Sequence, residues 1–571
     1  MNHLVQNSLS IADNISIYVG EHTITFGTQN EIFTNKVTYI ANAFGTYTYN
    51  TIADFLADNS SAYLRNYAVG SPAIRTSMAQ FGLYAQEEWQ VVQNFKLTYG
   101  LRLDIPVVFN SPRENQEFNA SEIAQKYGVR TDAKPRTDIM LSPRLGFRWN
   151  IAESNNALSV LRGGVGLFTG KIPFVWITNC FSNTGMTQLG YALYNDRTPA
   201  FGEEPSGETV SNPLINVVDK KFRYPQVLRA NLAFEQRFHG WKFVVEGIFS
   251  KTYNNILVDN LVAEDKGNRL YAVSADAANR YNTTTFYDSS LKSQNSAIYY
   301  LHNTNKGYSY SVSASIAKQF DCGLGLSAAY TFGHSFSVMD GISAQVSSVW
   351  SKTYATESNN AGLTYSLFDV PHKVSATLSY SRRYARLLGT TLSLVYQAYS
   401  GSRYSLTYYQ NNIDVNGDSS RGNTPMYIPT RSELAEMQFE NEEQRTAFGN
   451  YIESNRYLRT HRGRYAERNA MQTQFEHHLD LHIAQDFYFG AKTERKLQIS
   501  LDVMNFGNIL SRSWGTSYYL SNWKLSPVEV YALDDNGNGN KTPRYRYRGA
   551  TISKNDLLSR WHMQLGVRVV F

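Results

Sequence analysis

The chain has 571 residues with a formal net charge of +6, and 42% of its residues are hydrophobic, 14% aromatic and only 18% charged. No apolar run approaches the roughly 18–20 residues that a membrane-spanning helix needs, which excludes helical spans. The small positive charge fits anionic surroundings such as lipopolysaccharide head groups, and it argues against a nucleic-acid groove.

Two further features of the composition bear on the class of protein. Low charge with abundant tyrosine is typical of a β-barrel that offers lipid only every second residue, although a large secreted β-protein has a similar composition. The two cysteines, Cys180 and Cys322, are too few for a disulfide scaffold. Residues 1–20 lack the basic and apolar regions of a signal peptide, so for an exported protein we expect Met1 not to be the natural start.

Alternation of apolar and polar residues predicts strands along the whole chain. In 94–106 every second residue from Phe95 to Ile105 is apolar, and the residues between them are polar or glycine. Successive side chains of a strand point to opposite faces, so this pattern indicates a strand with two different surroundings. The expected strands are 8–19, 22–33, 75–90, 94–106, 139–151, 157–170, 224–238, 241–252, 307–320, 323–335, 371–383, 387–401, 475–489, 494–507 and 560–571.

The connections between these strands alternate between short and long. Short turns are expected at 20–21, 91–93, 152–156, 239–240, 321–322 and 490–493, and long segments at 34–74, 107–138, 171–223, 253–306, 336–370, 402–474 and 508–559. Short turns at one end and long loops at the other are typical of a transmembrane barrel with periplasmic turns and extracellular loops. Cys180 then lies in an outer loop and Cys322 in a periplasmic turn, too far apart for a disulfide.

The alternative to a barrel is a soluble sandwich with a dry core. In a sandwich, charged residues on the inner faces of strands would need costly desolvation, whereas a wet or plugged lumen accepts them. We therefore predict an all-β fold, a transmembrane antiparallel up-and-down β-barrel in the outer membrane of a Gram-negative-type cell. Bacterial barrels have even strand counts, so the fifteen expected strands predict that 1–571 is only part of a barrel.

Two loop segments carry other signals. Asp414, Asn416 and Asp418 have the D-x-N-x-D spacing of calcium loops, while Pro425 at the twelfth position excludes an EF-hand; an Asx-rich polar turn is the alternative. The same spacing recurs at 534–540 with the same two readings. Within 430–455, Thr430 and Glu433 form a capping box that predicts a helix inside a long loop.

Several motifs carry a family resemblance. "FGLYAQEEWQVVQNFKLTYGLRLD" (81–104) resembles the barrel hairpin of TonB-dependent outer-membrane receptors. "LSPRLGFRWNI" (141–151), "LRGGVGLFTGKIPFVWITN" (161–179), "YIESNRYLRTHRGRYAERN" (451–469) and "LDVMNFGN" (501–508) resemble its Oar-like branch. The resemblance implies a barrel of twenty-two strands, about fifteen of them present here. It also implies a preceding plug domain, TonB-contacting segment and small carboxypeptidase-regulatory-like domain, none of which is in this sequence.

The resemblance implies a receptor that takes up a ligand across the outer membrane with TonB-derived energy. Expected partners are outer-membrane lipid and lipopolysaccharide, an unidentified ligand, and the plug domain and TonB system in a full-length protein; no nucleic acid is expected. The lumen would hold the plug and conduct the ligand, although membership of a structural ion-pair network is the commoner role for such charges. The expected lumen residues are Lys96, Arg102, Asp104, Arg162, Arg229, Glu235, Asp480, His482 and Arg568.

Two other function classes remain open at this stage. A surface adhesin or assembly subunit would use the barrel only to anchor its loops. A barrel hydrolase would depend on His482 or Asp480, but the chain has no Ser-His-Asp order and no H-E-x-x-H, so no enzyme is predicted. No cofactor is expected apart from calcium at 414–418.

Overall fold

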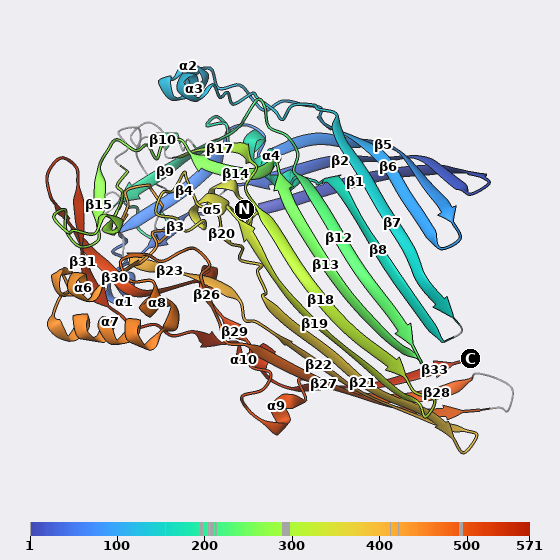
Figure 1. Cartoon of the computed structure of the whole chain (residues 1–571). Coiled ribbons are helices and arrows are strands. Elements are labelled where there is room, and N and C mark those ends of the chain that lie inside the picture. The colour runs from blue at the N-terminus through green and yellow to red at the C-terminus, as the bar shows by residue number, and fades with distance from the viewer. Residues whose placement is uncertain are drawn as a thin grey trace.

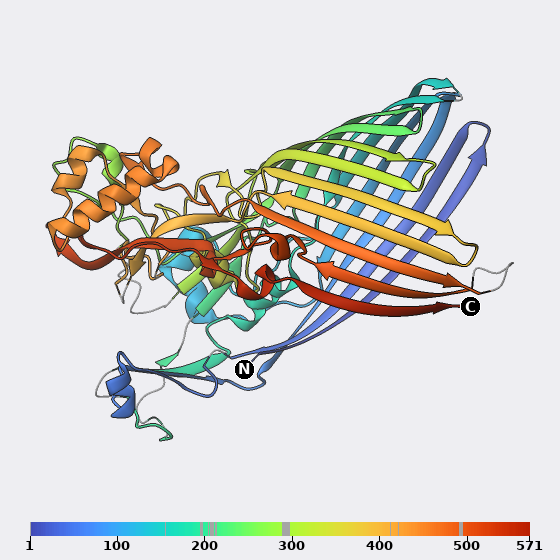
Figure 2. The same ribbon diagram turned by 90° about the horizontal axis from the view of Figure 1, so that it is seen from below.

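The computed structural model describes residues 2–571 except 41, 155, 195–197, 204, 206–209, 212–213, 288–296, 411–412, 421 and 490–494. Its strands form one strongly curved antiparallel sheet in which neighbours follow chain order (Figures 1 and 2). The long strands are β1 (Asn2–Val19), β2 (His22–Tyr39), β5 (Ala73–Val92), β6 (Phe95–Val108), β7 (Met140–Ser154), β8 (Ala157–Thr169), β12 (Gln226–Phe238), β13 (Trp241–Tyr253), β18 (Tyr308–Gln319), β19 (Leu324–Ser337), β21 (His372–Tyr384), β22 (Leu388–Tyr399), β27 (Glu476–Tyr488), β28 (Lys496–Met504) and β33 (His562–Val570).

Each of the fifteen strands expected from alternation is confirmed, with ends that differ by a few residues. The largest difference is at β1 and β2, which pair continuously from Val19↔His22 to Asn2↔Tyr39. Residues 2–7 and 34–39 carry polar side chains on both faces, so the alternation fades there although the backbone pairing continues. A short strand, β20 (Thr364–Tyr365), also pairs with β19.

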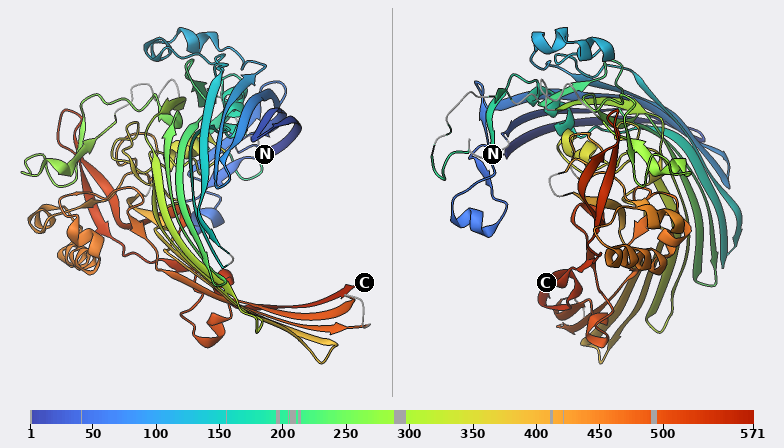
Figure 3. Two further views of the ribbon diagram at one scale, coloured as in Figure 1. Left: turned by 45° about the vertical axis from the view of Figure 1, so that its right-hand side comes forward. Right: turned by 90° about the vertical axis from the view of Figure 1, so that its left-hand side faces the viewer.

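The register gives the sheet two chemically different faces. Leu101 stands opposite Ala85 and Pro143, and this outer face carries mainly apolar side chains. Arg102 stands opposite Tyr84 and Ser142 on the other face, which is polar. The polar face is the concave one, because the loops fold back against it and bury Met78 at the end of β5 (Figure 3).

Tight turns join the strands at one end of the sheet. Gly20 has a φ of +57° between β1 and β2, and His239 and Gly240 have φ of 46° and 78° between β12 and β13. These left-handed conformations suit two-residue hairpin turns, which follow the twist of the strands. The expected turn at 490–493 lies outside the described residues. Cys322 is exposed at this end, whereas Cys180 is buried at the opposite end, and both are free thiols.

The connections at the other end are folded rather than open. Small sheets join loops that are distant in sequence. One contains β11 (Leu214–Val218), β17 (Ala297–Thr304) and β14 (Asn255–Asn260); a second contains β16 (Thr283–Thr285), β15 (Arg269–Tyr271), β31 (Lys541–Tyr547), β30 (Lys524–Asp535), β23 (Arg403–Gln410) and β26 (Met471–Gln472); a third contains β10 (Val210–Ser211), β9 (Gln188–Tyr194), β4 (Ala62–Ala68) and β3 (Thr46–Thr48). Two strand pairs are β24 (Tyr427–Ile428) with β25 (Arg464–Tyr465) and β29 (Tyr518–Tyr519) with β32 (Ser553–Lys554).

The helices are short and also belong to the loops. They are α1 (Ile52–Leu56), α2 (Gln116–Ala120), α3 (Glu122–Tyr127), α4 (Phe174–Ser182), α5 (Val346–Ser351), α6 (Arg431–Glu436), α7 (Glu442–Ser454), α8 (Arg456–Thr460), α9 (Gly507–Leu510) and α10 (Asp556–Ser559). Among the described residues no helix is long and apolar enough to cross a membrane.

The hydrophobic core lies mainly in this loop layer. One cluster packs α4 and α5 against β14 and β17, with Trp176 and Trp350 buried between them. A second gathers residues of β23, β30 and β31 around α6 and α7, with Phe448 and Tyr545 fully buried. The loops are therefore a packed layer over one end of the sheet (Figure 1).

The helix expected within 430–455 is interrupted. The capping box of Thr430 and Glu433 is confirmed at the start of α6, but the chain leaves the helix after Glu436 and begins α7 at Glu442. Phe439, in the break, packs at a tilt against the rings of Phe448 and Tyr545 in the second core cluster. Burying this aromatic side chain requires an extended backbone that a continuous helix would not provide.

Candidate functional site

All nine expected lumen residues project from the concave face of the sheet. The cross-strand pairs show this directly, because Lys96 stands opposite Arg148 and Arg148 opposite Arg162. The same alternation continues through β12, β22, β27 and β28 to Arg568 on β33. They lie on five strands, so they form several groups along the curve rather than one cluster.

The first group lies on β5 and β6. Arg102 Nη2 is 3.0 Å from Asp104 Oδ1, and Gln80 Nε2 donates to the same oxygen at 3.2 Å. Asp104 is only 2% exposed. Lys96 Nζ is 2.8 Å from Glu88 Oε2. These contacts neutralise the charges pairwise along the strands.

The second group lies on β8, β12 and β13. Arg162 Nη1 is 3.2 Å from Glu246 Oε1, and Glu235 Oε1 is 2.8 Å from Arg237 Nε. Arg229 differs from these, since its Nε donates to the Ser250 hydroxyl at 3.3 Å.

A hollow of about 340 Å³ opens beside Arg229 on the concave face. Hydroxyl side chains form much of its wall, and Phe368 and Val370 of the loop layer border it. The hydroxyl residues are Ser250, Ser309, Ser311, Thr331 and Ser335. Asp369, which pairs with Arg403, also lines the hollow. A cationic side chain among small hydroxyls is suited to hydrogen bonding with a polar solute.

The third group lies on β27 and β28. His482 Nδ1 is 2.6 Å from Asp502 Oδ1, and Asp480 Oδ1 accepts a hydrogen bond from the Asn505 backbone at 2.6 Å. Ser393 stands directly opposite His482, which completes a Ser-His-Asp row across three strands. No hydrogen bond joins Ser393 to His482 in the described part of the chain, so the row lacks the contact that activates a serine nucleophile.

The sequence did not reveal the partners of these charges. Glu246 pairs with Arg162 although its strand lies far along the chain. Asp502 pairs with His482 from the next strand. In both pairs, the register between strands decides that the two side chains meet. Alternation places each residue on the inner face, but it does not fix which neighbour stands opposite. Exact hairpin lengths would have given the pairs within one hairpin, such as His482 with Asp502.

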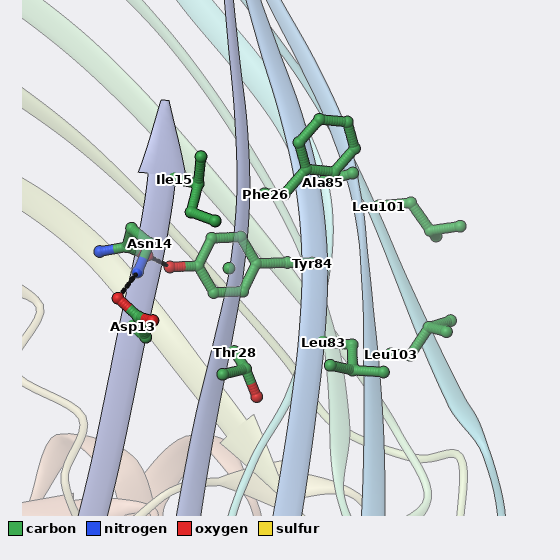
Figure 4. A pocket seen from close by; sticks show the side chains of 11 residues that line it. Asp13, Asn14, Ile15, Phe26, Thr28, Leu83, Tyr84, Ala85, Leu101 and Leu103 are labelled. Atoms are coloured by element: carbon green, nitrogen blue, oxygen red, sulfur yellow. Dashed lines mark hydrogen bonds between the residues drawn. The ribbon is translucent and has the colours of Figure 1, made fainter. Parts of the chain in front are cut away.

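A second hollow, of about 490 Å³, lies on the opposite, outer face between β1, β2, β5 and β6 (Figure 4). Apolar side chains line much of it, including Ile15, Phe26 and Leu101, and its polar members are Asp13, Asn14, Thr28 and Tyr84. The register places most of these residues on the apolar face, whereas Asn14 and Tyr84 alternate to the polar face. The hollow shares no lining residue with the one beside Arg229.

The two segments with calcium-loop spacing, 414–418 and 534–538, differ sharply in their surroundings. In the hairpin between β30 and β31, Asp534 pairs with Arg544 at 2.8 Å and Asp535 with Lys541 at 2.8 Å, as in an ordinary charged turn. In the segment after β23, Asp418 and Asn416 are almost fully buried. Burial raises the pKa of the Asp418 carboxyl above its ordinary value. Calcium binding at Asp414, Asn416 and Asp418 stays a prediction.

A sheet with an apolar convex face, a polar concave face, tight turns at one end and long loops at the other defines a transmembrane β-barrel protein. The model of the outer membrane beta barrel domain family matches residues 2–513, so the chain belongs to this family. It is accordingly an outer-membrane protein. No curated protein matches the chain.

Several solved structures are similar over much of this chain. They include the FrpB iron transporter from Neisseria meningitidis (10% identity, TM-score 0.46, covering 99% of this chain and 55% of that one). Others are the outer membrane transporter YddB from Escherichia coli (12%, 0.45, 99% and 54%) and the ferric enterobactin receptor PfeA from Pseudomonas aeruginosa (11%, 0.43, 96% and 54%). The chain spans about half the length of these structures.

Proposed function

We propose that the chain forms the wall of an uptake receptor, which carries a ligand across the outer membrane with TonB-derived energy in the complete protein. The observation that carries this proposal is the concave face, which carries mainly polar side chains beneath a folded loop layer. A structural anchor requires no such lining, because only the outer face must match lipid.

The width of the sheet supports a conducting lumen. Barrels of about eight strands are filled by their own side chains, whereas those of 16–18 strands enclose water and larger ones hold a plug. Fifteen long strands already exceed what side chains can fill. The inner ion pairs, such as Arg162 with Glu246, keep charges at the wall and leave the centre open to a plug domain or a solute.

The two ends of the sheet would divide the work of uptake. We place the tight turns in the periplasm and the loop layer outside the cell, as in other outer-membrane barrels. The loop layer would capture the ligand, and the inner face would hold the plug and pass the ligand inward. Arg229 and its hydroxyl neighbours offer a polar contact on that route.

Uptake by cells tests this proposal. Cells expressing the complete protein, and cells lacking it, are incubated in a defined mixture of hydrophilic solutes, and the solutes left in the medium are quantified by mass spectrometry. We expect depletion of at least one solute only by the expressing cells, and loss of that depletion when an uncoupler collapses the proton gradient. Equal solute profiles in both cell types would refute transport, and depletion that survives the uncoupler would refute energy coupling.

The rival function is a surface adhesin or assembly subunit, and the packed loop layer is the observation that favours it. The second core cluster gives the loops a folded surface of their own. An adhesin would leave the solute profile unchanged while increasing attachment of the cells to surfaces or to one another. The same two cell types therefore separate the rival from the uptake receptor.

A further inference from the structure

The segment between β23 and β24 buries polar side chains that have no apparent reason to leave water. Asn416, Asp418 and Asn423 are 0%, 1% and 1% exposed, although they belong to a polar loop. Buried polar groups are normally hydrogen-bonded, and buried charges are paired or bind metals. The hydrogen bonds that these side chains make and lack therefore indicate which ligand the segment would bind.

Among the described residues, the hydrogen-bond donors to the Asp418 carboxylate are all neutral. Oδ1 accepts from the Ser420 backbone at 2.7 Å, and Oδ2 accepts from the Ser358 hydroxyl and from the amides of Asn416 and Asn423. Within the described part of the chain, no ion pair joins Asp418 to a Lys, Arg or His side chain. The described residues thus bury this carboxylate without giving it a counter-charge.

In the part of the chain that the structure describes, two amide oxygens beside this carboxylate have no hydrogen-bond partner. Asn416 Oδ1 and Asn423 Oδ1 are both buried without a hydrogen bond. Both amides point their nitrogens at Asp418 Oδ2, from 3.2 Å for Asn416 Nδ2 and from 2.6 Å for Asn423 Nδ2. A half-turn of each amide about its last side-chain bond would bring both oxygens to the carboxylate at similar distances.

Oxygens gathered at such spacing repel one another unless a cation lies between them. Ca²⁺ takes six to eight oxygen ligands from carboxylates, amides and backbone carbonyls at about 2.3–2.6 Å, which places neighbouring ligand oxygens about 3 Å apart. We propose that Asp418, Asn416 and Asn423, together with Asp414 at the start of the motif, bind a Ca²⁺ ion. The all-oxygen ligand set excludes a preference for zinc or copper.

The ion would join three loops. Ser358, in the loop after α5, donates to Asp418, and its backbone donates to the Tyr287 hydroxyl at 2.9 Å. The Tyr287 backbone donates to the Asn416 carbonyl at 2.7 Å, which links the loop after β13 to the same point. Calcium would therefore fasten the loop layer over the concave face, whether or not the protein transports a ligand.

Calcium titration of the complete protein, purified in detergent and treated with chelator, tests the site. We expect isothermal calorimetry to show one saturable Ca²⁺ site, and saturating CaCl₂ to raise the melting temperature by several degrees. Mg²⁺ at the same concentration should have a smaller effect, because it sheds its waters reluctantly and fits a dry cage poorly. Absence of both the heat and the thermal shift would overturn the proposal.

Two substitutions and a control locate the site. Asp418→Asn should abolish the binding heat. Asp534→Asn, in the segment 534–538 of the same spacing, should leave it unchanged because that carboxylate already pairs with Arg544. Asn423→Asp covers the case in which Asp418→Asn fails to fold. The added carboxylate should lower stability without calcium and tighten Ca²⁺ binding roughly tenfold. Binding that survives Asp418→Asn, or that Asn423→Asp fails to strengthen, would contradict the assignment.

Discussion

Leu101 projects from the outer face of β6 beside Ala85 and Pro143, and 45% of its surface is exposed. Exposure of a large apolar side chain is unfavourable in water and favourable in lipid. The inner neighbour on the same strand, Arg102, has the opposite requirement and is held by Asp104. The face on which a residue of this sheet lies therefore decides whether its side chain is apolar or polar.

Replacing Leu101 with Arg should destabilise the barrel by about 2–4 kcal/mol, because the charge would enter the lipid near the middle of the strand. Urea unfolding in lipid vesicles, with heat resistance of the folded band on gels, measures the change. Thr98→Arg is the matched control, since Thr98 lies on the concave face opposite Glu88. Equal losses for the two variants would show that the outer face does not meet lipid.

Asp13 interrupts the apolar outer face of β1 between Ile11 and Ile15, opposite Thr28. A carboxylate on a lipid-facing strand is unfavourable, so Asp13→Leu should stabilise the folded protein by up to about 2 kcal/mol in the same unfolding experiment. Ala12→Leu, on the concave face, should bring no such gain. Destabilisation by Asp13→Leu would instead mean that a polar partner covers this part of β1.

At the scale of elements, the long strands were predictable and the loop structures were not. Side chains of a strand between lipid and lumen must alternate between apolar and polar. The alternate apolar residues from Met563 to Val569 therefore predicted β33. In β23 both faces are buried, from Tyr404 to Tyr408, and the alternation disappears. Parallel pairing of β23 with β30 depends on loop packing that no local pattern encodes.

The candidate site was predictable in part for the same reason. Period-two alternation gives the face of Arg162 or His482, but the contacts of those side chains depend on register between strands. In the calcium segment the spacing identified Asp414, Asn416 and Asp418. It could not identify Asn423 or Ser358, which reach Asp418 only after the loops pack.

The junction between α6 and α7 gives a pH-dependent prediction. Both Glu440 carboxylate oxygens accept from Arg546, at 2.8 and 2.9 Å, and Gln444 also donates to Glu440. These hydrogen bonds, chiefly that of Arg546, lower the pKa of Glu440 from 4.5 to about 2. A lowered pKa means that the contact stabilises the fold fully above pH 4.5 and is lost as pH falls toward 2.

We therefore expect the segment 437–454 to exchange its amide hydrogens faster as pH falls from about 4.5 to 2, after correction for intrinsic exchange rates. Glu440→Gln should exchange fast at every pH in that range and show no such transition. Glu442→Gln, which removes a carboxylate paired only within α7 to Arg445, is the control and should keep the transition. Persistence of the transition in Glu440→Gln would assign it to another group.

At the scale of the whole molecule, the sheet is an open arc. Among the described residues, β1 pairs only with β2 and β33 only with β28, and the two edges face each other across the gap (Figure 3). Backbone groups cannot stay unpaired in lipid, so we expect both edges to pair with further strands. Because β1 and β33 are the first and last of fifteen antiparallel strands, they run the same way. Antiparallel closure of the barrel therefore requires an odd number of further strands between them.

Two adjacent proline substitutions in β1 test whether its free edge is covered. Along an antiparallel strand, backbone N–H groups point alternately toward each neighbour, so Ile11 and Ala12 direct theirs to opposite sides. One proline removes a bond to β2, and the other removes a bond to the strand that closes the barrel. We expect Ile11→Pro and Ala12→Pro both to abolish the heat-resistant folded form in the outer membrane, while Ile11→Val and Ala12→Ser retain it. If one of the two prolines folds normally, β1 is a free edge and the barrel is not closed there.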